Sequence, residues 1–231
     1  MGEASWFGAA LAALWTQSRS LHGGVRVISV DYREGPEFKF PAACVDVAAV
    51  YRGLLKKYPA KNIGIYGCSS GGMITAESVA WFSRSQLPRR GAIGIFGSGA
   101  FALMRGDSGY TGALLFGTPP WSEDLKSVPY FDVPGLERND PLASPCASSA
   151  ELRRFPPTLL ISGTRDPGLS AAAYTNSQLV KLGVQSELHV WEGAAHCSFA
   201  LPLADPKVPE TREAWNVIVK FFDRILGYEL D

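Results

Sequence analysis

The sequence lacks a surplus of either charge, because 22 Lys and Arg residues balance 22 Asp and Glu residues. A neutral chain has no electrostatic footprint for nucleic acid, so no nucleic-acid partner is expected. It also lacks a run of about 18 apolar residues, which excludes a membrane span of that kind. Its four cysteines, Cys44, Cys68, Cys146 and Cys197, form no metal-ligand cluster. We therefore expect no bound metal, reduced cysteines and a cytoplasmic location.

The patterns that are present indicate an α/β protein. Short β-branched runs alternate with longer helical patterns, which is typical of βαβ units and a mostly parallel sheet with flanking helices. The 231 residues are enough for one domain with a large core. Strands are predicted at 25–30, 63–66, 92–96, 158–162 and 186–191, and helices at 1–20, 41–55, 70–84, 170–182 and 210–226.

Residues 99–157 break this alternation. The stretch is rich in glycine and proline and is too long for a plain connection. Ligand sites of α/β folds lie at the carboxyl ends of the strands. We therefore predict a single domain over residues 1–231, in which 99–157 form an inserted partial cap or lid over that end of the sheet.

Residues 67–72 carry the strongest chemical signal. They read G-C-S-S-G-G between a predicted strand and a predicted helix, and G-x-S-x-G in that context is typical of a nucleophile elbow. Ser69 is the predicted nucleophile, and the backbone N–H of Ser70 is a predicted oxyanion-hole donor. Small residues at positions 67 and 71 are expected to relieve crowding at the turn. The remaining elbow residues are Gly67, Cys68, Gly71 and Gly72.

A serine hydroxyl needs a base, and the base needs an orienting acid. Of three histidines, His196 follows the strand predicted at 186–191 and lies among small residues, whereas His189 lies inside that strand and is interpreted as structural. Asp166 follows the strand predicted at 158–162, which gives the chain order Ser, Asp, His of α/β hydrolases. Glu192 is the alternative acid, but it is only four residues from His196.

These motifs give the chain a resemblance to the bacterial hormone-sensitive-lipase-like esterases over nearly its whole length. The resemblance rests on Ser29-Val-Asp-Tyr-Arg33, Gly35-Pro-Glu37, Phe40-Pro-Ala-Ala43, the elbow, Asp140-Pro-Leu-Ala-Ser-Pro145, Pro156-Pro-Thr-Leu-Leu160, Asp166 and His196. It implies an α/β-hydrolase fold, no cofactor, a homodimer, and hydrolysis of small-molecule esters with short to medium acyl chains. It assigns Ser69, His196 and Asp166 the roles of nucleophile, base and acid.

The chain departs from that family at three places. Cys68 and Ser70 stand where the family has an acidic residue and alanine, and Ser170 replaces a second aspartate after the acid. The family's HGGG oxyanion loop has no counterpart, because His22-Gly-Gly24 precedes a strand instead of following one. We therefore expect that the strand between those ending at Asp31 and Gly67 is absent with its loop. Weak activity, and higher activity in a chain extended upstream, are the consequences.

The sequence thus predicts a serine carboxylic-ester hydrolase that acts through an acyl-enzyme. Two alternatives come from other classes: a catalytically weak or inactive piece of the hydrolase fold, and a ligand-binding protein on a hydrolase scaffold. An amidase or acyltransferase would use the same chemistry.

Overall fold

The computed structural model describes residues 25–115, 122, 124–200 and 209–227. At its centre lies a parallel sheet of four strands in the order β1-β2-β3-β4. The strands are β1 (Gly64–Cys68), β2 (Ala92–Phe96), β3 (Thr158–Gly163) and β4 (Ser186–Trp191). The helices are α2 (Ala42–Leu55), α3 (Ser70–Arg84), α4 (Asp107–Leu115), α5 (Ser149–Leu152), α6 (Leu169–Lys181) and α7 (Pro209–Leu226). The predicted α/β class and parallel sheet are confirmed.

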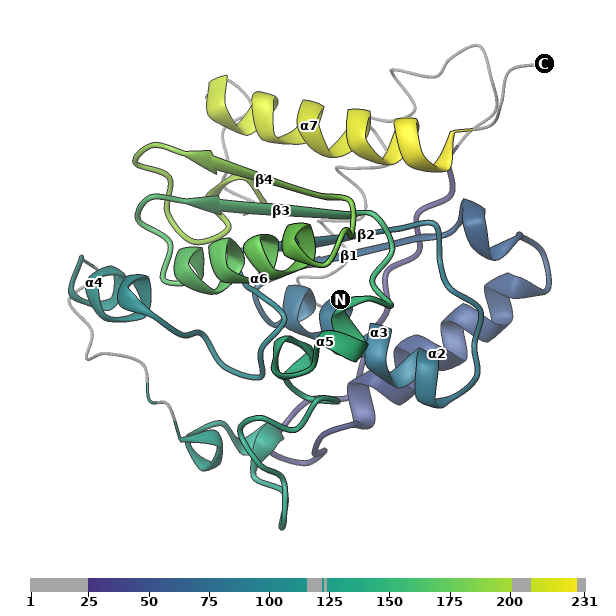
Figure 1. Cartoon of the computed structure of the whole chain (residues 1–231), viewed down its shortest axis with the longest axis horizontal. Coiled ribbons are helices and arrows are strands. Elements are labelled where there is room, and N and C mark those ends of the chain that lie inside the picture. Colours follow the sequence, from purple (N-terminus) through teal and green to yellow (C-terminus); the bar gives the residue numbers. More distant parts are fainter. Residues whose placement is uncertain (1–24, 116–121, 123, 201–208, 228–231) are drawn as a thin grey trace.

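Helices cover both faces of the sheet, with α7 on one side and α2, α3 and α6 on the other (Figure 1). Successive side chains of β2 and β3 point to opposite faces, and both strands are fully buried. Phe96 and Leu159 therefore pack against Phe222 of α7. Ile95 and Leu160 pack in a second core, built with side chains of α3 and α6. The two edge strands, β1 and β4, are only partly buried.

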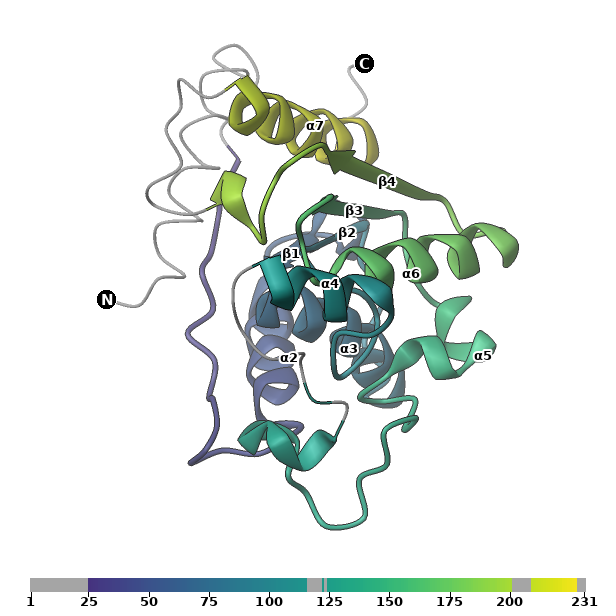
Figure 2. The same cartoon turned by 90° about the vertical axis from the view of Figure 1, so that its left-hand side faces the viewer.

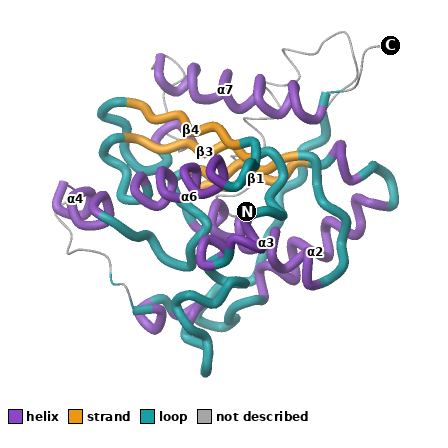
Figure 3. Tube along the Cα trace, viewed as in Figure 1, coloured by secondary structure: helices purple, strands orange, loops and turns teal. Residues whose placement is uncertain are grey.

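The strand predicted at 25–30 is wrong. Residues 25–34 hold no strand ladder, and they run as an extended segment from α7 toward α2 (Figure 2, purple; loop in Figure 3). Val25 and Val27 pack against the α7 core, and Val30 packs against the core between α2 and α3. The β-branched residues of this segment favour an extended backbone. A strand also needs a hydrogen-bonded neighbouring strand, and the segment pairs with none of the four strands of the described sheet.

Two further predictions concern residues outside the described ranges. The helix predicted at 1–20 and the segment His22-Gly-Gly24 lie there, so the structure does not test whether a strand is missing beside β1. None of the helices in the described residues is long and apolar enough to cross a membrane.

The stretch 99–157 contains α4, α5 and short 3₁₀ helices at Leu125–Ser127, Pro129–Phe131 and Pro145–Ala147. Its buried side chains Leu103, Leu125 and Phe131 form a separate apolar cluster with Phe40. This cluster holds the irregular segment against the beginning of α2. That the stretch acts as a cap stays a prediction.

Candidate active site

The elbow residue Ser69 lies between the end of β1 and the beginning of α3. Its backbone has φ 57° and ψ −122°, a left-handed conformation that is strained for any residue other than glycine. Its N–H donates a 2.9 Å hydrogen bond to the carbonyl of Phe96, at the end of β2. Ser70 is the first residue of α3, so its N–H is among those that a helix leaves without an internal acceptor.

Two glycines make this turn sterically feasible. A Cβ at Gly67 would collide with the backbone of Gly71, and a Cβ at Gly72 would lie 3.0 Å from the carbonyl oxygen of Phe96. A Cβ at Gly71 would meet no atom within 4 Å. The expectation of crowding therefore holds at position 67 but not at position 71, and Gly72 is the second glycine that the turn requires.

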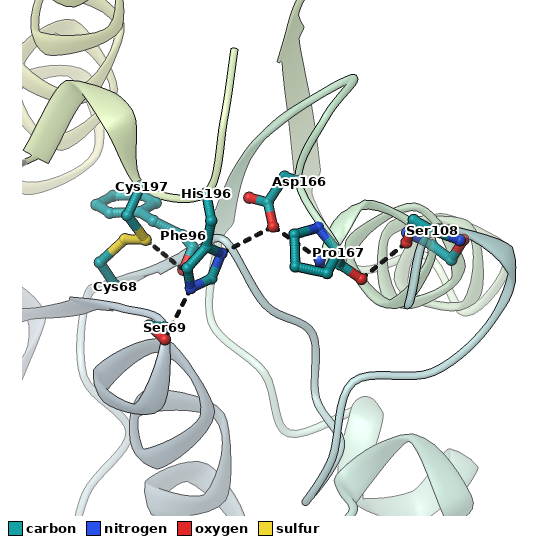
Figure 4. Close-up of polar contacts among 10 residues, drawn as sticks. Cys68, Ser69, Phe96, Ser108, Asp166, Pro167, His196 and Cys197 are labelled. Atoms are coloured by element: carbon teal, nitrogen blue, oxygen red, sulfur yellow. Dashed lines mark hydrogen bonds and ion pairs between the residues drawn. A yellow bond between two sulfur atoms is a disulfide. The ribbon is translucent and has the colours of Figure 1, made fainter. Parts of the chain in front are cut away.

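The three side chains singled out in the sequence meet at the carboxyl ends of the strands (Figure 4). His196 Nε2 lies 2.8 Å from Ser69 Oγ. Its other ring nitrogen, Nδ1, lies 2.8 Å from Asp166 Oδ1. The Asp166 side chain is 1% exposed and that of His196 is 23% exposed. A half-buried serine is thus joined through an imidazole to a buried carboxyl group.

Backbone contacts fix the loop that carries Asp166. The N–H of Gly168 donates a 2.7 Å hydrogen bond to Asp166 Oδ1, and α6 begins directly afterwards. Ser108 of α4 donates to the carbonyl of Pro167 at 2.8 Å and accepts from the N–H of Ser170 at 2.8 Å. Ser170 Oγ accepts in turn from the N–H of Ser108 at 3.0 Å. Ser170, one of the residues that depart from the family pattern, therefore connects α4 to the acid loop.

The expectation that the cysteines are reduced and unpaired is wrong for two of them. Cys68 and Cys197 form a disulfide, whereas Cys44 and Cys146 are free. The pairing of Cys68 with Cys197 was not evident from the sequence, because 129 residues separate them. A signal was nevertheless present: Cys68 precedes Ser69 and Cys197 follows His196, and the predicted site requires Ser69 and His196 to lie close together.

The alternatives lie away from this centre. His189 is within β4 and contacts Glu187 and Trp191, in agreement with a structural role. Glu192 is exposed, whereas His196 Nδ1 faces Asp166.

Sequence reasoning missed Gly97, which follows β2. Its φ is +61°, and a Cβ there would lie 3.0 Å from His196 Cε1. Gly97 thus lets the imidazole pass close to the end of β2.

A cavity of about 210 Å³ adjoins the elbow. Ser70 and Glu77 of α3 line it together with Tyr32, Tyr130 and Phe131. A larger cavity of about 450 Å³ lies between β4 and α7 and is lined by His189, Trp191 and Lys220, among others. We associate the smaller one with the site, because it includes the neighbour of Ser69.

Fold and site together define a hydrolase-type arrangement: a serine on a strained strand-to-helix turn, joined to a histidine and a buried aspartate in the order Ser, Asp, His. The chain belongs to the α/β-hydrolase-fold family, whose model matches residues 8–200. Within that family it is hormone-sensitive-lipase-like, as the sequence motifs predicted.

Solved structures support this placement. The chain is similar to the crystal structure of esterase E25, with a TM-score of 0.79 and 34% identity over 97% of this chain and 65% of that one. It is also similar to an esterase from the bacterial hormone-sensitive lipase family, with a TM-score of 0.74 and 27% identity over 85% of this chain and 65% of that one. The chain therefore spans just under two thirds of each of these structures.

Curated relatives agree. The chain is 26% identical over 208 residues to an acetyl-hydrolase of Streptomyces hygroscopicus, covering 88% of this chain and 67% of the relative. It is 47% identical over 47 residues to versiconal hemiacetal acetate esterase of Emericella nidulans, covering 20% of this chain and 16% of that enzyme.

Proposed function

We propose that the protein is a serine carboxylic-ester hydrolase in which Ser69 is the nucleophile, His196 the general base and Asp166 the orienting acid. The observation that carries the proposal is the continuous contact from Ser69 Oγ through His196 to Asp166 Oδ1, with both distances at 2.8 Å. Hydrogen-bond reach between nucleophile, base and orienting acid is the geometric requirement of this chemistry.

The proton positions follow from the donors and acceptors. An ionised carboxylate only accepts hydrogen bonds, so His196 Nδ1 donates to Asp166 and Nε2 is left to accept the proton of Ser69. Ser69 Oγ attacks the ester carbonyl as its proton moves to Nε2. The imidazolium then protonates the departing alcohol, and a water activated in the same way releases the acid from the acyl-enzyme. These steps involve no cofactor.

The negative charge of the tetrahedral intermediate needs a donor. Ser70 N–H fits this role, because it lies next to the nucleophile at the positive end of α3. One such donor is worth roughly 10²–10³ in rate.

Substrates with short to medium acyl chains fit the small cavity beside Ser70. Tyr130 and Phe131 give it an aromatic wall, and both come from the stretch 99–157, which we propose as a partial cap. Two curated relatives are named for acetyl esters or acetyl groups. A panel of p-nitrophenyl esters from acetate to dodecanoate should therefore give the highest kcat/KM at the short end, and a maximum at dodecanoate would contradict this substrate class.

A Ser69→Ala variant tests the assignment of the nucleophile. We expect kcat to fall by roughly three or more orders of magnitude, with unchanged circular dichroism. A fluorophosphonate should label Ser69 of the wild type, identified by peptide mass spectrometry, but not the variant. Ser177→Ala is the matched control, because Ser177 is exposed on α6. A wild type that takes no label and hydrolyses no ester would favour the ligand-binding alternative.

Homodimerisation and a cytoplasmic location remain predictions from the sequence. Light scattering on the purified chain measures the first. The cytoplasmic prediction relied on reduced cysteines, and disulfides such as Cys68–Cys197 are more common in oxidising compartments. Cell fractionation is therefore the direct measurement of the location.

A further inference from the structure

The Cys68–Cys197 disulfide joins the two catalytic loops next to their reactive residues. Cys68 is the last residue of β1 and directly precedes Ser69, and Cys197 directly follows His196 (Figure 4). Their Cα atoms are 6.4 Å apart across a sequence separation of 129 residues. The bond therefore closes a covalent link around the contact between serine and histidine.

The sheet does not provide this connection. β1 and β4 lie at opposite edges of the four-stranded sheet, so the two loops meet without sharing a ladder. The first part of the histidine loop is held to the turn after β3, since Gly193 N–H donates to Thr164 Oγ1 at 2.7 Å and Arg165 N–H to the Ala194 carbonyl at 3.1 Å. These bonds connect the histidine loop to the acid loop, not to the elbow.

The conformation at the bridge fits a positioning role. Cys197 has φ +50°, which a residue with a Cβ seldom adopts. A Cβ on Gly97 would lie 2.8 Å from Cys197 Sγ and 3.0 Å from His196 Cε1, so the sulfur and the imidazole pack side by side against the turn after β2. Displacement of the sulfur would therefore free space next to the ring.

We infer that the Cys68–Cys197 disulfide is a positioning element that holds His196 on Ser69, so that its reduction lowers kcat while KM changes little. The inference rests on the proposed function. A shift of about 1 Å in a catalytic group can cost roughly 10² in rate, so the loss is expected to be at least about tenfold.

The disulfide would be reduced by thiol–disulfide exchange with a dithiol reductant. One thiolate of the reductant attacks a sulfur of the bridge, breaks the S–S bond and forms a mixed disulfide. Its second thiol then closes a ring on the reductant and releases the second cysteine. Two electrons pass from the dithiol to the bridge, and Cys68 and Cys197 end as thiols. An oxidised disulfide such as oxidised glutathione reverses the exchange.

The test compares one preparation in two states, after oxidised glutathione and after dithiothreitol. Peptide mass spectrometry measures the fraction of protein in which Cys68 and Cys197 are linked, and circular dichroism measures whether the fold is retained. The state of the active site is measured by kcat, KM and the rate of fluorophosphonate labelling. We expect the reduced protein to stay folded, to lose at least about tenfold in kcat and in labelling rate, and to regain both on reoxidation. A Cys68→Ser/Cys197→Ser double variant should have the low kcat of the reduced protein, and dithiothreitol should not change it. Cys146→Ser is the control that keeps the full response, because its thiol is free.

The other outcomes separate the hypotheses. Free thiols at both positions after oxidation would overturn the inference, as would a reduced, folded enzyme that keeps its kcat within twofold. Unfolding on reduction would also overturn it, because the bond would then stabilise the chain and not position the base. If the linked protein neither hydrolyses esters nor takes the label, the proposed function itself fails, and the mass spectrum still establishes the link.

Discussion

Two buried carboxyl groups, Asp166 and Glu77, have different surroundings: Asp166 lies on the loop after β3, and Glu77 lies on α3, where it lines the cavity beside the elbow. Each is about 1% exposed. At the carboxyl ends of the strands, Asp166 Oδ1 faces two nitrogen groups, the N–H of Gly168 and the Nδ1 of His196. Between α2 and α3, Glu77 Oε2 accepts one weak hydrogen bond from the thiol of Cys44 at 3.5 Å. Equal burial thus comes with very different hydrogen bonding.

The difference determines what each group does. Burial raises the pKa of Glu77 to about 8, and the bond from Cys44 only partly opposes this effect. Glu77 is therefore protonated at neutral pH, as a buried carboxyl group without strong donors should be. Asp166 Oδ1 instead lies within hydrogen-bond distance of two nitrogens, the arrangement that the proposed orienting acid requires. Replacing a carboxyl group by an amide preserves its shape, so the same type of substitution can be compared at both residues.

The largest effect is expected for Asp166→Asn. Gly168 N–H and His196 Nδ1 both contact the same oxygen, Asp166 Oδ1. An amide nitrogen in that place would face both groups and favour the wrong tautomer, and an amide oxygen there would lack the negative charge that stabilises the imidazolium. In a Ser-His-Asp triad this change lowers kcat by about 10⁴. Steady-state kinetics with p-nitrophenyl acetate measures it. A variant within tenfold of the wild type would show that Asp166 is not the orienting acid, and Glu192→Gln would then be the next variant to assay.

Much of the site and of the sheet could be predicted because the signals can be read directly from the sequence. Ser69 stands in a short motif, Asp166 follows a predicted strand, and His196 is one of only three histidines. β2 and β4 were predicted with their observed bounds because their residue patterns are equally clear. β1 extends through Gly67 and Cys68 beyond its predicted end, because pairing with Ile95 and Phe96 continues into the elbow.

What the sequence missed depends on partners far along the chain. The segment 25–30 has the composition of a strand but no ladder, and pairing is not encoded in one segment alone. Glu77 was not singled out, because its burial arises from the packing of α2 against α3. Similarly, the need for glycine at 72 but not at 71 follows from the path of β2 beside the elbow.

An intermediate effect, on stability and its pH dependence, is expected for Glu77→Gln. A carboxyl group whose folded pKa is raised contributes fully below its unfolded pKa of about 4.3, and this contribution is lost as pH rises through about 8. Between these limits the unfolded state releases a proton that the folded state keeps. The free energy of unfolding therefore falls by up to about 1.4 kcal/mol per pH unit. Glutamine cannot titrate, so the variant should lack this component.

Urea unfolding at pH 5, 6, 7 and 8 measures the two slopes. The wild type should lose stability with pH more steeply than Glu77→Gln across this range. Parallel curves would mean that Glu77 is already ionised in the folded protein.

The smallest effect is expected for Glu187→Gln, which places the same change on the protein surface. Glu187 lies on the edge strand β4 and pairs with Arg224 of α7, and these side chains are 32% and 55% exposed. Water and salt screen such a pair, so it contributes about 0–1 kcal/mol. The loss in unfolding free energy should stay in that range and shrink further in 1 M NaCl. This variant is the exposed counterpart of Glu77→Gln. A loss of several kcal/mol that persists in salt would contradict this expectation. It would mean that the ion pair between β4 and α7 stabilises the fold far more than the exposure of its side chains indicates.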